Sequence, residues 1–391
     1  MIVLGLISGT SIDAIDVAAA ELSWRGGDIL LRPLGHREHP WPTQTRARLL
    51  ATLPPARTSM EEACRLDVLT GEAFAAAAMA ANAELAAGRA ELVASHGQTV
   101  FHWVEDGRAR GTLQLGQPAC LVEATGLPVV SDFRARDVAA GGQGAPLAST
   151  LDALWLADPS GARRAALNLG GIANLTVVGP PGAPVLAFDS GPASCLLDAE
   201  ATRLSGGALS CDRDGQMARA GRVRGDLLAR LLAEPYYARE PPKSTGRELF
   251  HTGYARAAME GLPPVSPPDL MATLNELTAA TVADACLAQS VAEVVASGGG
   301  VRNPALLAAL RRRLAPVPLA TSDARGLPSD GKEAYLFALL GFLTWHQVPG
   351  VAPGATGSRV PRVLGRISPG DAPLRLPEPA NAPRRLLVIP S

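Results

Sequence analysis

Short apolar runs that end in glycine-containing turns predict two β-hairpins in this chain. One run covers residues 2–7, and a second β-prone stretch follows the turn at 8–11. The same order recurs with apolar runs at 165–169 and 175–178, which flank a pair of glycines. A short apolar run bounded by turn residues is typical of a buried strand. The hairpins lie about 160 residues apart, roughly one domain length, so the pattern indicates two lobes of similar build.

Longer stretches with helical character separate and follow these hairpins. Helices are expected at residues 60–87, 145–157, 268–287 and 332–347. A strand is expected at 291–296. One more helix is expected after it, because Asn303 can cap a first turn and proline suits the first helical position. The Pro- and Gly-rich tail from residue 349 onward is expected to lie over the surface. Strands and helices mixed along the whole chain indicate the α/β class.

Charge and cysteine content narrow the possible partners. Lys and Arg number 36 against 37 Asp and Glu, a formal net charge of −1, and the densest basic run is 311–313. Nucleic acids and anionic membranes select basic surfaces, so neither is expected as a partner. The apolar N-terminal stretch stops at Ser8, which is too short for a signal peptide or a membrane span. Five scattered cysteines without a CxxC pair indicate free thiols, and we expect a cytoplasmic protein.

The turn of the first hairpin carries groups suited to phosphate. Gly9 lets a ligand approach backbone N–H groups, and three hydroxyl side chains surround it. An acid that follows, Asp13 or Asp16, could hold hydrated Mg²⁺. The segment is not a P-loop, because it lacks Gly-Lys-Ser/Thr and a strand follows the turn. The alternative interpretation is an ordinary hairpin turn rich in serine and glycine.

Two further segments lie at the ends of predicted strands. The glycines at 298–300, with Asn303, join a strand to a helix where a nucleotide can approach backbone N–H groups. A tight strand-to-helix turn explains them equally well. Asp189 ends an apolar strand just before a Gly-Pro turn, at the edge where α/β proteins bind ligands. Its alternative role is to cap that turn.

The segment at 95–99 offers polar groups that suit sugar hydroxyls. It carries His96, Gln98 and Thr99 after a strand at 92–94, and the alternative is a plain polar loop. A zinc site is not expected, because His96 and His102 lack a third clustered ligand.

Three charged segments have two interpretations each. Arg134 is one of two cations that stand with two acids at 132–137, a segment that could hold a substrate carboxylate or form a salt-bridged loop. Lys243 and Arg247 could face a phosphate or carboxylate, while the spacing from Thr245 to Glu248 fits a capping box that starts a helix. Glu333 opens the last helix, where it suits the helix dipole or contacts a ligand beside the turn at 330–331.

In this order, the segments resemble the motif series of the anhydro-N-acetylmuramic acid kinases. The matching motifs are SGTSIDAIDVA, ASHGQT, DFRARDVAAGGQGAPLAS, NLGGIANLT, FDSGPAS, PPKSTGRE, SGGGVRNP and SDGKEAYLFALL. The resemblance reaches from about residue 4 to residue 370. It implies the two-lobed actin/hexokinase/Hsp70-like ATPase fold, with ATP in the cleft between the lobes. Lobe I would span residues 1–160 and lobe II residues 161–330, with 331–391 as a helix and tail that pack on lobe I.

The resemblance also implies a reaction and its residues. Members of the family open the 1,6-anhydro ring of the sugar with water and transfer the γ-phosphoryl group of ATP to O6, giving N-acetylmuramic acid 6-phosphate in cell-wall recycling. Asp189 is then the base that takes the proton of the water. The implied cofactors are ATP and Mg²⁺, the implied partner is the small sugar, and a homodimer is compatible with the sequence.

The implied binding residues fall into two sets. Those for the nucleotide are Gly9, Thr10, Ser11, Ile12, Asp13, Ala14, Ile15, Asp16, Gly170, Gly171, Gly298, Gly299, Gly300 and Asn303, with Asp13 also reaching the metal through water. Those for the sugar are His96, Gln98, Thr99, Arg134 and Glu333.

The chain departs from the family pattern at three places. Ile12 and Ala14 stand where leucine and glycine are common, which tightens the turn without removing a donor. Ser194 stands where asparagine is common, which shortens a hydrogen-bonding side chain near Asp189. Two other functions stay open at this point: a related kinase of another sugar, and a non-catalytic nucleotide switch of the same fold. An acid at the end of that strand argues against the switch.

Overall fold

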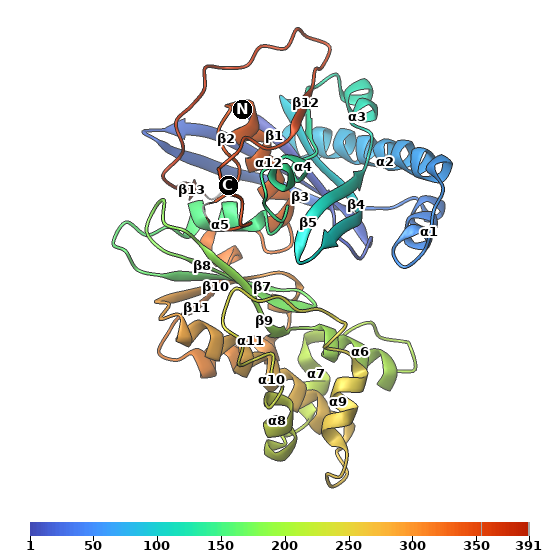
Figure 1. The fold of residues 1–391 in the computed structure, drawn as a ribbon, viewed down its shortest axis with the longest axis vertical. Helices are drawn as coiled ribbons and strands as arrows, with labels where there is room; N and C mark the ends of the chain where they lie inside the picture. The colour runs from blue at the N-terminus through green and yellow to red at the C-terminus, as the bar shows by residue number, and fades with distance from the viewer. Residues whose placement is uncertain (353, 390–391) are drawn as a thin grey trace. The chain divides into compact units, whose positions relative to one another are not determined.

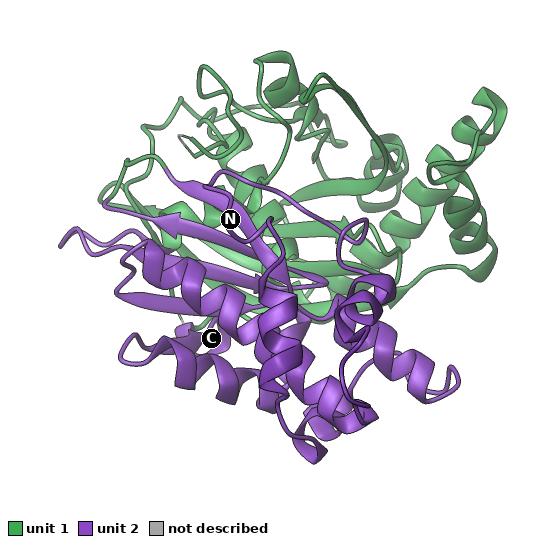
Figure 2. Ribbon diagram, turned by 60° about the horizontal axis from the view of Figure 1, so that its bottom comes forward, with its two compact units in different colours: residues 1–155, 181–184, 326–391 green, residues 156–180, 185–325 purple. Residues whose placement is uncertain are grey.

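The computed structural model describes residues 1–352 and 354–389. The chain divides into two compact units (Figure 2): residues 1–155, 181–184 and 326–391 form unit 1, and residues 156–180 and 185–325 form unit 2. Each unit is built on its own β-sheet with helices around it (Figure 1), which confirms the predicted α/β class. The functional lobes expected at 1–160, 161–330 and 331–391 stay a prediction.

Unit 1 contains an eight-stranded sheet in the order β12-β6-β4-β1-β2-β3-β13, with β5 paired to β4. Its strands are β1 (Ile2–Ser8), β2 (Ala14–Arg25), β3 (Asp28–Pro40), β4 (Leu92–Glu105), β5 (Arg108–Leu115), β6 (Val129–Ser131), β12 (Arg366–Ser368) and β13 (Leu386–Val388). The strands β1 and β2 pair antiparallel, with Ile7 opposite Asp16, so the first predicted hairpin is confirmed. Strand β4 lies parallel on the other side of β1.

Helices cover both faces of this sheet. They are α1 (Thr43–Thr52), α2 (Met60–Ala86), α3 (Pro118–Thr125), α4 (Ala135–Ala139), α5 (Ala148–Leu156), which ends at the unit boundary, and α12 (Lys332–Trp345). Alternate side chains of a strand point to opposite faces, so Leu4 packs with the α2 core and Val3 with the α12 core. At Gly5 the helix α12 crosses β1 closely, because a Cβ there would lie 2.0 Å from the carbonyl oxygen of Ala334. Glycine at this position is therefore a packing requirement.

The helices predicted in unit 1 are present, with small shifts at their ends. The hydroxyl of Ser59 accepts a hydrogen bond from the Glu62 N–H at the start of α2, and Ala87 ends the helix in the left-handed region. Helix α12 begins at the predicted residue, and α5 begins three residues later than predicted, at Ala148 instead of 145.

Two other expectations for unit 1 are wrong. Residues 95–99 are not a loop, because β4 continues through them to Glu105 and pairs first with β1 and then with β5. The tail does more than lie over the surface: β12 pairs antiparallel with β6, and β13 pairs parallel with β3. The C-terminal segment therefore supplies two edge strands of the sheet.

Unit 2 contains a five-stranded sheet in the order β11-β10-β7-β8-β9. Its strands are β7 (Arg164–Leu169), β8 (Ile172–Val178), β9 (Leu186–Pro192), β10 (Glu293–Ser297) and β11 (Leu319–Thr321). The antiparallel pair of β7 and β8 confirms the second predicted hairpin. The strand expected at 291–296 is present as β10 and starts two residues later.

The helices of unit 2 surround the long helix α10. They are α6 (Cys195–Leu204), α7 (Gln216–Ala220), α8 (Gly225–Leu232), α9 (Thr252–Met259), α10 (Pro267–Ala288) and α11 (Pro304–Leu314), with short 3₁₀ turns η1 (Arg213–Gly215), η2 (Gly299–Arg302) and η3 (Asp323–Arg325). Residues of α10 belong both to the core under the sheet and to a second core with α6, α8 and α9. The side chain of Asn303 caps α11, accepting hydrogen bonds from the N–H groups of Ala305 and Leu306 at 3.0 and 3.1 Å, as predicted.

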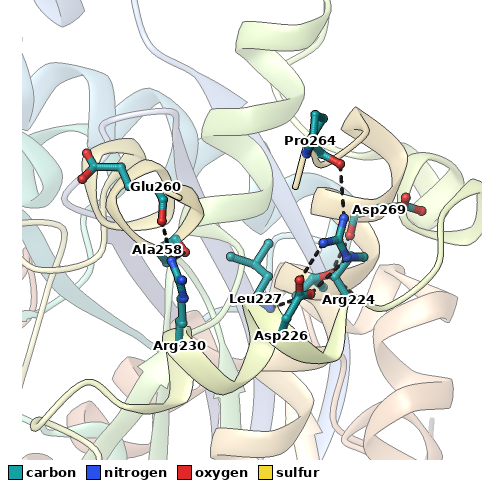
Figure 3. Close-up of polar contacts among 9 residues, drawn as sticks. Arg224, Asp226, Leu227, Arg230, Ala258, Glu260, Pro264 and Asp269 are labelled. Atoms are coloured by element: carbon teal, nitrogen blue, oxygen red, sulfur yellow. Dashed lines mark hydrogen bonds and ion pairs between the residues drawn. The ribbon is translucent and has the colours of Figure 1, made fainter. Parts of the chain in front are cut away.

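Polar contacts fix α8 to its neighbours (Figure 3). The guanidinium of Arg224 donates to both carboxylate oxygens of Asp226, at 3.0 and 2.6 Å, and to the Pro264 carbonyl. At the other end of the helix, Arg230 donates to the carbonyl oxygens of Ala258 and Glu260 at the end of α9. The position of α8 is therefore set by hydrogen bonds to backbone as well as by its apolar face.

Among residues 1–352 and 354–389, no helix has the length and apolar character needed to cross a membrane.

Candidate functional site

The turn between β1 and β2 presents exposed hydroxyls on an anchored backbone. Thr10 and Ser11 are exposed, whereas Ile12 is buried with a φ of 54° and its N–H donates to the Gly9 carbonyl at 3.1 Å. A positive φ is costly for a β-branched residue, so the surrounding structure must hold this conformation. Arg46 contributes by donating to the Ile12 carbonyl at 2.7 Å. The turn is therefore a fixed feature with its polar tip free.

Space around the glycines separates packing roles from ligand roles. A Cβ on Gly9 would meet only the Ser11 hydroxyl, at 3.9 Å, and one on Gly299 only the Arg302 guanidinium, at 3.5 Å. Gly298 differs, because its φ is +83° and a Cβ would lie 2.4 Å from the Asn168 side chain. A Cβ on Gly300 would lie 2.6 Å from that of Leu169. The tight-turn interpretation therefore explains Gly298 and Gly300. Packing within the protein does not explain Gly9 and Gly299, where a side chain would fit.

Strand β4 carries the polar residues predicted for the sugar. His96 is buried and stacks on Phe337 with ring centroids 4.5 Å apart. Its Nε2 lies 3.4 Å from the Thr99 hydroxyl, and the side-chain amide of Gln98 donates to the carbonyls of Gly9 and Thr99 at 3.2 and 3.1 Å. Gln98 thus links β4 to the hairpin turn, so part of the nucleotide set and part of the sugar set lie together in unit 1.

Several buried polar atoms of this group have no partner among the described residues. They are His96 Nδ1, Gln98 Oε1 and Arg134 Nε. Buried polar atoms are nearly always hydrogen-bonded in folded proteins. A bound polar ligand would supply the missing partners.

The pKa values in this region reflect crowded charges. Burial, with the nearby Arg134 cation, holds the pKa of His96 well below its usual range, so its imidazole is neutral at pH 7. Burial also lowers the pKa of Arg134, which Glu333 opposes. The Glu333 side chain is exposed, although many protein atoms lie around its carboxylate, and the resulting partial desolvation raises its pKa. The nearby cations Lys332 and Arg134 oppose this increase. Arg134 and Glu333 are therefore electrostatic neighbours, as their joint assignment to the sugar requires.

Asp16 is the most perturbed carboxyl group of the hairpin. Burial and then the charges of Glu38, Glu333 and Asp330 raise its pKa to about 7. A carboxylate repelled by other carboxylates gains from any cation placed among them.

This shift predicts a pH-dependent stability. An unfolded aspartate titrates near pH 4, so between about pH 4 and 7 the native state binds more protons than the unfolded state, and stability falls as pH rises. Asp16→Asn removes this titration. Its free energy of unfolding relative to wild type should therefore increase by roughly 1–2 kcal/mol from pH 4.5 to pH 8, allowing for partial solvent screening.

Urea denaturation in EDTA-containing buffer measures this difference. Asp13→Asn, which removes an exposed carboxylate from the same hairpin, is the matched control. A difference between Asp16→Asn and wild type that stays constant with pH would contradict the assignment.

Asp13 and Asp16 are the candidate metal ligands of the hairpin. The exposed Asp13 carboxylate lies 3.3 Å from the Arg46 guanidinium. The described residues contain no cluster of three or more His, Cys, Asp or Glu side chains able to hold a metal by themselves. Mg²⁺ ordinarily uses one or two carboxylates plus waters and substrate phosphates, so these two acids fit a metal that arrives with a nucleotide.

Asp189 lies in the middle of β9 and not at the end of a strand as predicted, because the strand continues through Ser190 and Gly191 to Pro192 and stays paired with β8. Hydrogen bonds hold it from several directions. Its Oδ1 accepts a hydrogen bond from the Asn174 side chain at 2.8 Å, and its Oδ2 accepts one from the Thr245 N–H at 3.0 Å. Its backbone N–H donates to the Lys243 carbonyl at 3.0 Å, and its carbonyl accepts from the Tyr236 hydroxyl at 2.8 Å. The alternative role, capping a Gly-Pro turn, is wrong, because Gly191 and Pro192 belong to β9 and pair with β8. The arrangement fixes the direction of one carboxylate.

The second hairpin turn lies near a free cation. Gly170 and Gly171 have room for a Cβ, and their carbonyls accept hydrogen bonds from the N–H groups of residues 193–195. The Arg247 guanidinium lies 3.6 Å from where a Gly171 Cβ would stand, and it forms no hydrogen bond or ion pair with the residues that the structure describes. Arg247 is therefore suited to a ligand anion.

The other predictions for residues 241–248 change with the structure. The capping box from Thr245 to Glu248 is wrong, because no helix begins there: α9 starts at Thr252 and is capped by His251. The Thr245 N–H serves Asp189 instead. The Lys243 ammonium donates to the carbonyls of Tyr236 and Tyr237 at 3.2 and 2.9 Å, so it braces this segment from within.

Sequence reasoning missed the partners of Asp189. Asn174 is a polar residue in an otherwise apolar strand and sits in register opposite Asp189, which was a usable signal within the motif NLGGIANLT. The Thr245 N–H and the Tyr236 hydroxyl left no local signal, because both come from a segment 47 to 56 residues away along the chain.

Comparison with known proteins adds a family. A family profile described as anhydro-N-acetylmuramic acid kinase matches residues 1–370. A Streptomyces avermitilis protein of that name is 58% identical over 389 residues, covering 99% of this chain and 100% of its own. Proteins of the same name from Streptomyces coelicolor and Rhodococcus erythropolis are 56% and 50% identical, covering 100% and 99% of this chain and 99% of each relative. The ROK hexokinase structure from Thermus thermophilus covers 88% of this chain and 99% of its own, at 20% identity and a TM-score of 0.36.

Proposed function

Because this chain belongs to the anhydro-N-acetylmuramic acid kinase family, we propose that it uses ATP to convert anhydro-N-acetylmuramic acid to N-acetylmuramic acid 6-phosphate. The reaction opens the 1,6-anhydro ring with water and phosphorylates O6, as part of cell-wall recycling. The observation that carries the proposal is the carboxylate of Asp189, held within β9 by Asn174 and Thr245.

Asp189 acts as the general base. Each of its carboxylate oxygens accepts one hydrogen bond from the protein and keeps a further lone pair for a water molecule. Water loses a proton to Asp189 as it attacks the anomeric carbon, and the bond from that carbon to O6 breaks. The released O6 then attacks the γ-phosphorus, and ADP leaves. Holding the base in one orientation lowers the entropy cost of the attack.

Each hairpin turn, taken by itself, carries groups suited to a phosphate of ATP. The first turn supplies hydrogen-bond donors from backbone N–H groups and hydroxyls at Gly9–Ser11. The second supplies them from the open turn at Gly170–Gly171 and from the Arg247 guanidinium. No side chain obstructs a ligand at these positions. Phosphoryl transfer depends on such positioning and charge more than on covalent help from the protein. Asp16, and Asp13 through water, would hold Mg²⁺, which neutralises phosphate charge when bound. Gly299 and the start of α11, which Asn303 caps, would contact another part of the nucleotide.

The sugar binds at the group on β4, α4 and α12. The unpartnered atoms His96 Nδ1, Gln98 Oε1 and Arg134 Nε gain their hydrogen bonds from its polar groups. The Arg134 guanidinium suits the lactyl carboxylate, because its planar fork matches a carboxylate. Thr99 and Glu333 complete the set. ATP and a sugar phosphate belong to cytoplasmic metabolism, and the unpaired state of all five cysteines supports that location.

Arg134→Lys tests the sugar site. Lysine keeps the charge but loses the fork, so KM for the sugar should rise about tenfold or more while KM for ATP stays unchanged. Steady-state kinetics measure both constants. Arg136→Lys, on the exposed side of the same helix α4, is the matched control. A larger effect on ATP than on sugar would place Arg134 at the nucleotide.

One assay tests the proposed activity as a whole. Incubation with ATP and anhydro-N-acetylmuramic acid should give a product heavier than the sugar by one water and one phosphoryl group, detected by mass spectrometry. Parallel incubations with glucose or N-acetylglucosamine identify a kinase of another sugar. ATP hydrolysis at the same rate without any sugar would indicate a nucleotide switch and would overturn the proposal.

A further inference from the structure

A cavity of about 410 Å³ lies in unit 2, on the face of β9 opposite to the Asp189 carboxylate. Phe188 and Ser190, the residues on either side of Asp189, line it, and alternate side chains of a strand point to opposite faces. Its other walls come from the end of α8, the second half of α10 and residues 237–243. The volume is in the range of small-molecule sites. The catalytic groups described above do not line it.

The cavity combines an apolar floor with a rim that carries both charges. Leu232, Tyr237 and Ala285 form apolar walls, and α8, which carries Leu232, is fixed by the contacts in Figure 3. At the rim, the side chains of Arg239 and Asp284 are exposed and form no hydrogen bond or ion pair with any described residue; the Arg239 guanidinium lies 6.0 Å from the centre of the Tyr236 ring. Two opposite charges, those of Arg239 and Asp284, therefore stand without ion-pair partners beside an apolar cavity.

One wall of the cavity also forms hydrogen bonds to Asp189, the proposed general base. We call residues 236–245 the strap. Tyr237 and Lys243 of the strap line the cavity. The same segment makes three hydrogen bonds with Asp189. The Lys243 carbonyl accepts one from the Asp189 N–H, and the Tyr236 hydroxyl donates one to the Asp189 carbonyl. The Thr245 N–H donates the third to the Asp189 carboxylate. A ligand that presses on the strap will shift the groups that orient the carboxylate.

We propose that this cavity binds a small zwitterionic molecule with an apolar side chain, an amino acid or short peptide, and that its occupation alters turnover through the strap. A ligand ammonium would pair with Asp284 and a ligand carboxylate with Arg239, while the side chain fills the floor. The lining carries two cations, Arg239 and Lys243, and two acids, Glu240 and Asp284, so it suits a ligand with both charges better than a dianion such as phosphate. A neutral ligand would form no ion pair with either Arg239 or Asp284. The effect on turnover rests on the proposed role of Asp189, whereas the binding does not.

Calorimetry on the full chain tests the binding without substrates. The probes are leucine, alanyl-alanine and alanyl-leucine, and N-acetyl-alanyl-leucine amide is the uncharged control. We expect saturable binding of at least one zwitterion, and weaker binding of the uncharged control. Arg239→Ala and Asp284→Ala should each weaken it at least about tenfold, because each removes one charge pair. Arg219→Ala, an exposed arginine on α7, should leave it unchanged.

A cavity-filling variant tests the place and the coupling. Ala285→Trp occupies the floor and should abolish binding; if it does not fold, the two exposed rim variants still decide the question. Saturating dipeptide should change kcat of wild type and of Arg219→Ala, but not of Arg239→Ala at the same concentration. No saturable binding of any zwitterion up to ~10 mM, or binding that survives every cavity variant, would overturn the site. Binding that leaves kcat unchanged in an active enzyme would overturn the coupling, and an inactive enzyme that still binds would count against the proposed function alone.

Discussion

Asp189→Asn should reduce kcat by about 10²–10⁴-fold, the usual contribution of a general base. Asparagine has nearly the same shape and can still accept one of the hydrogen bonds, from Asn174 or from the Thr245 N–H. It cannot accept a proton from water. The loss should therefore appear in kcat, while calorimetry shows ATP and sugar still binding, as expected when a transition-state interaction is removed.

Asp214→Asn is the matched control for this variant. Asp214 lies in unit 2 with a φ of 54°, a conformation that asparagine adopts as readily as aspartate. Its kcat should equal that of wild type. An Asp189→Asn enzyme with full kcat would mean that the carboxylate only joins β9 to its neighbours and that the base lies elsewhere.

Gly9→Val should lower the affinity for ATP by about 10–100-fold, or roughly 1.4–2.8 kcal/mol. The structure has room for the side chain, because a Cβ on Gly9 meets nothing closer than the Ser11 hydroxyl at 3.9 Å. The fold should survive, and the branched side chain should block the nucleotide from backbone N–H groups. Calorimetry with a non-hydrolysable ATP analogue measures the affinity, and thermal unfolding monitors the fold.

Gly5→Val provides the contrast on the same hairpin. A Cβ there would lie 2.0 Å from the Ala334 carbonyl oxygen in α12, so this variant should unfold at lower temperature than wild type or fail to fold. If instead Gly9→Val lost stability and kept its ATP affinity, Gly9 would be a packing residue and the phosphate site would lie elsewhere.

The hairpins, the α/β class and the principal helices were predictable because their signals are local. Short apolar runs identify β1 and β7, and the cap Asn303 marks the start of α11. The functional meaning of a glycine was not predictable in the same way. Gly9 and Gly298 both follow a strand, yet one faces open space and the other touches Asn168. Only the three-dimensional neighbours tell the two apart.

Long-range pairing explains what the sequence could not show. His96 and Gln98 look like loop residues, but β4 continues through them because β1 and β5 supply partners. The three-residue strands of the tail exist only as additions to β6 and β3. Thr245 has the spacing of a helix cap, and its N–H is used by Asp189, 56 residues away. In each case a distant partner overrides the local pattern.

Product formation in ¹⁸O-labelled water tests the central claim most directly. If Asp189 activates water for attack on the anomeric carbon and O6 attacks phosphorus, the sugar 6-phosphate should carry one label at the anomeric position. The phosphate group should carry none. Mass spectrometry with fragmentation locates the label, and the spectrum must be read quickly because reducing sugars exchange the anomeric oxygen slowly with water. Label on the phosphate, or an intact anhydro ring after ATP has been consumed, would contradict the mechanism.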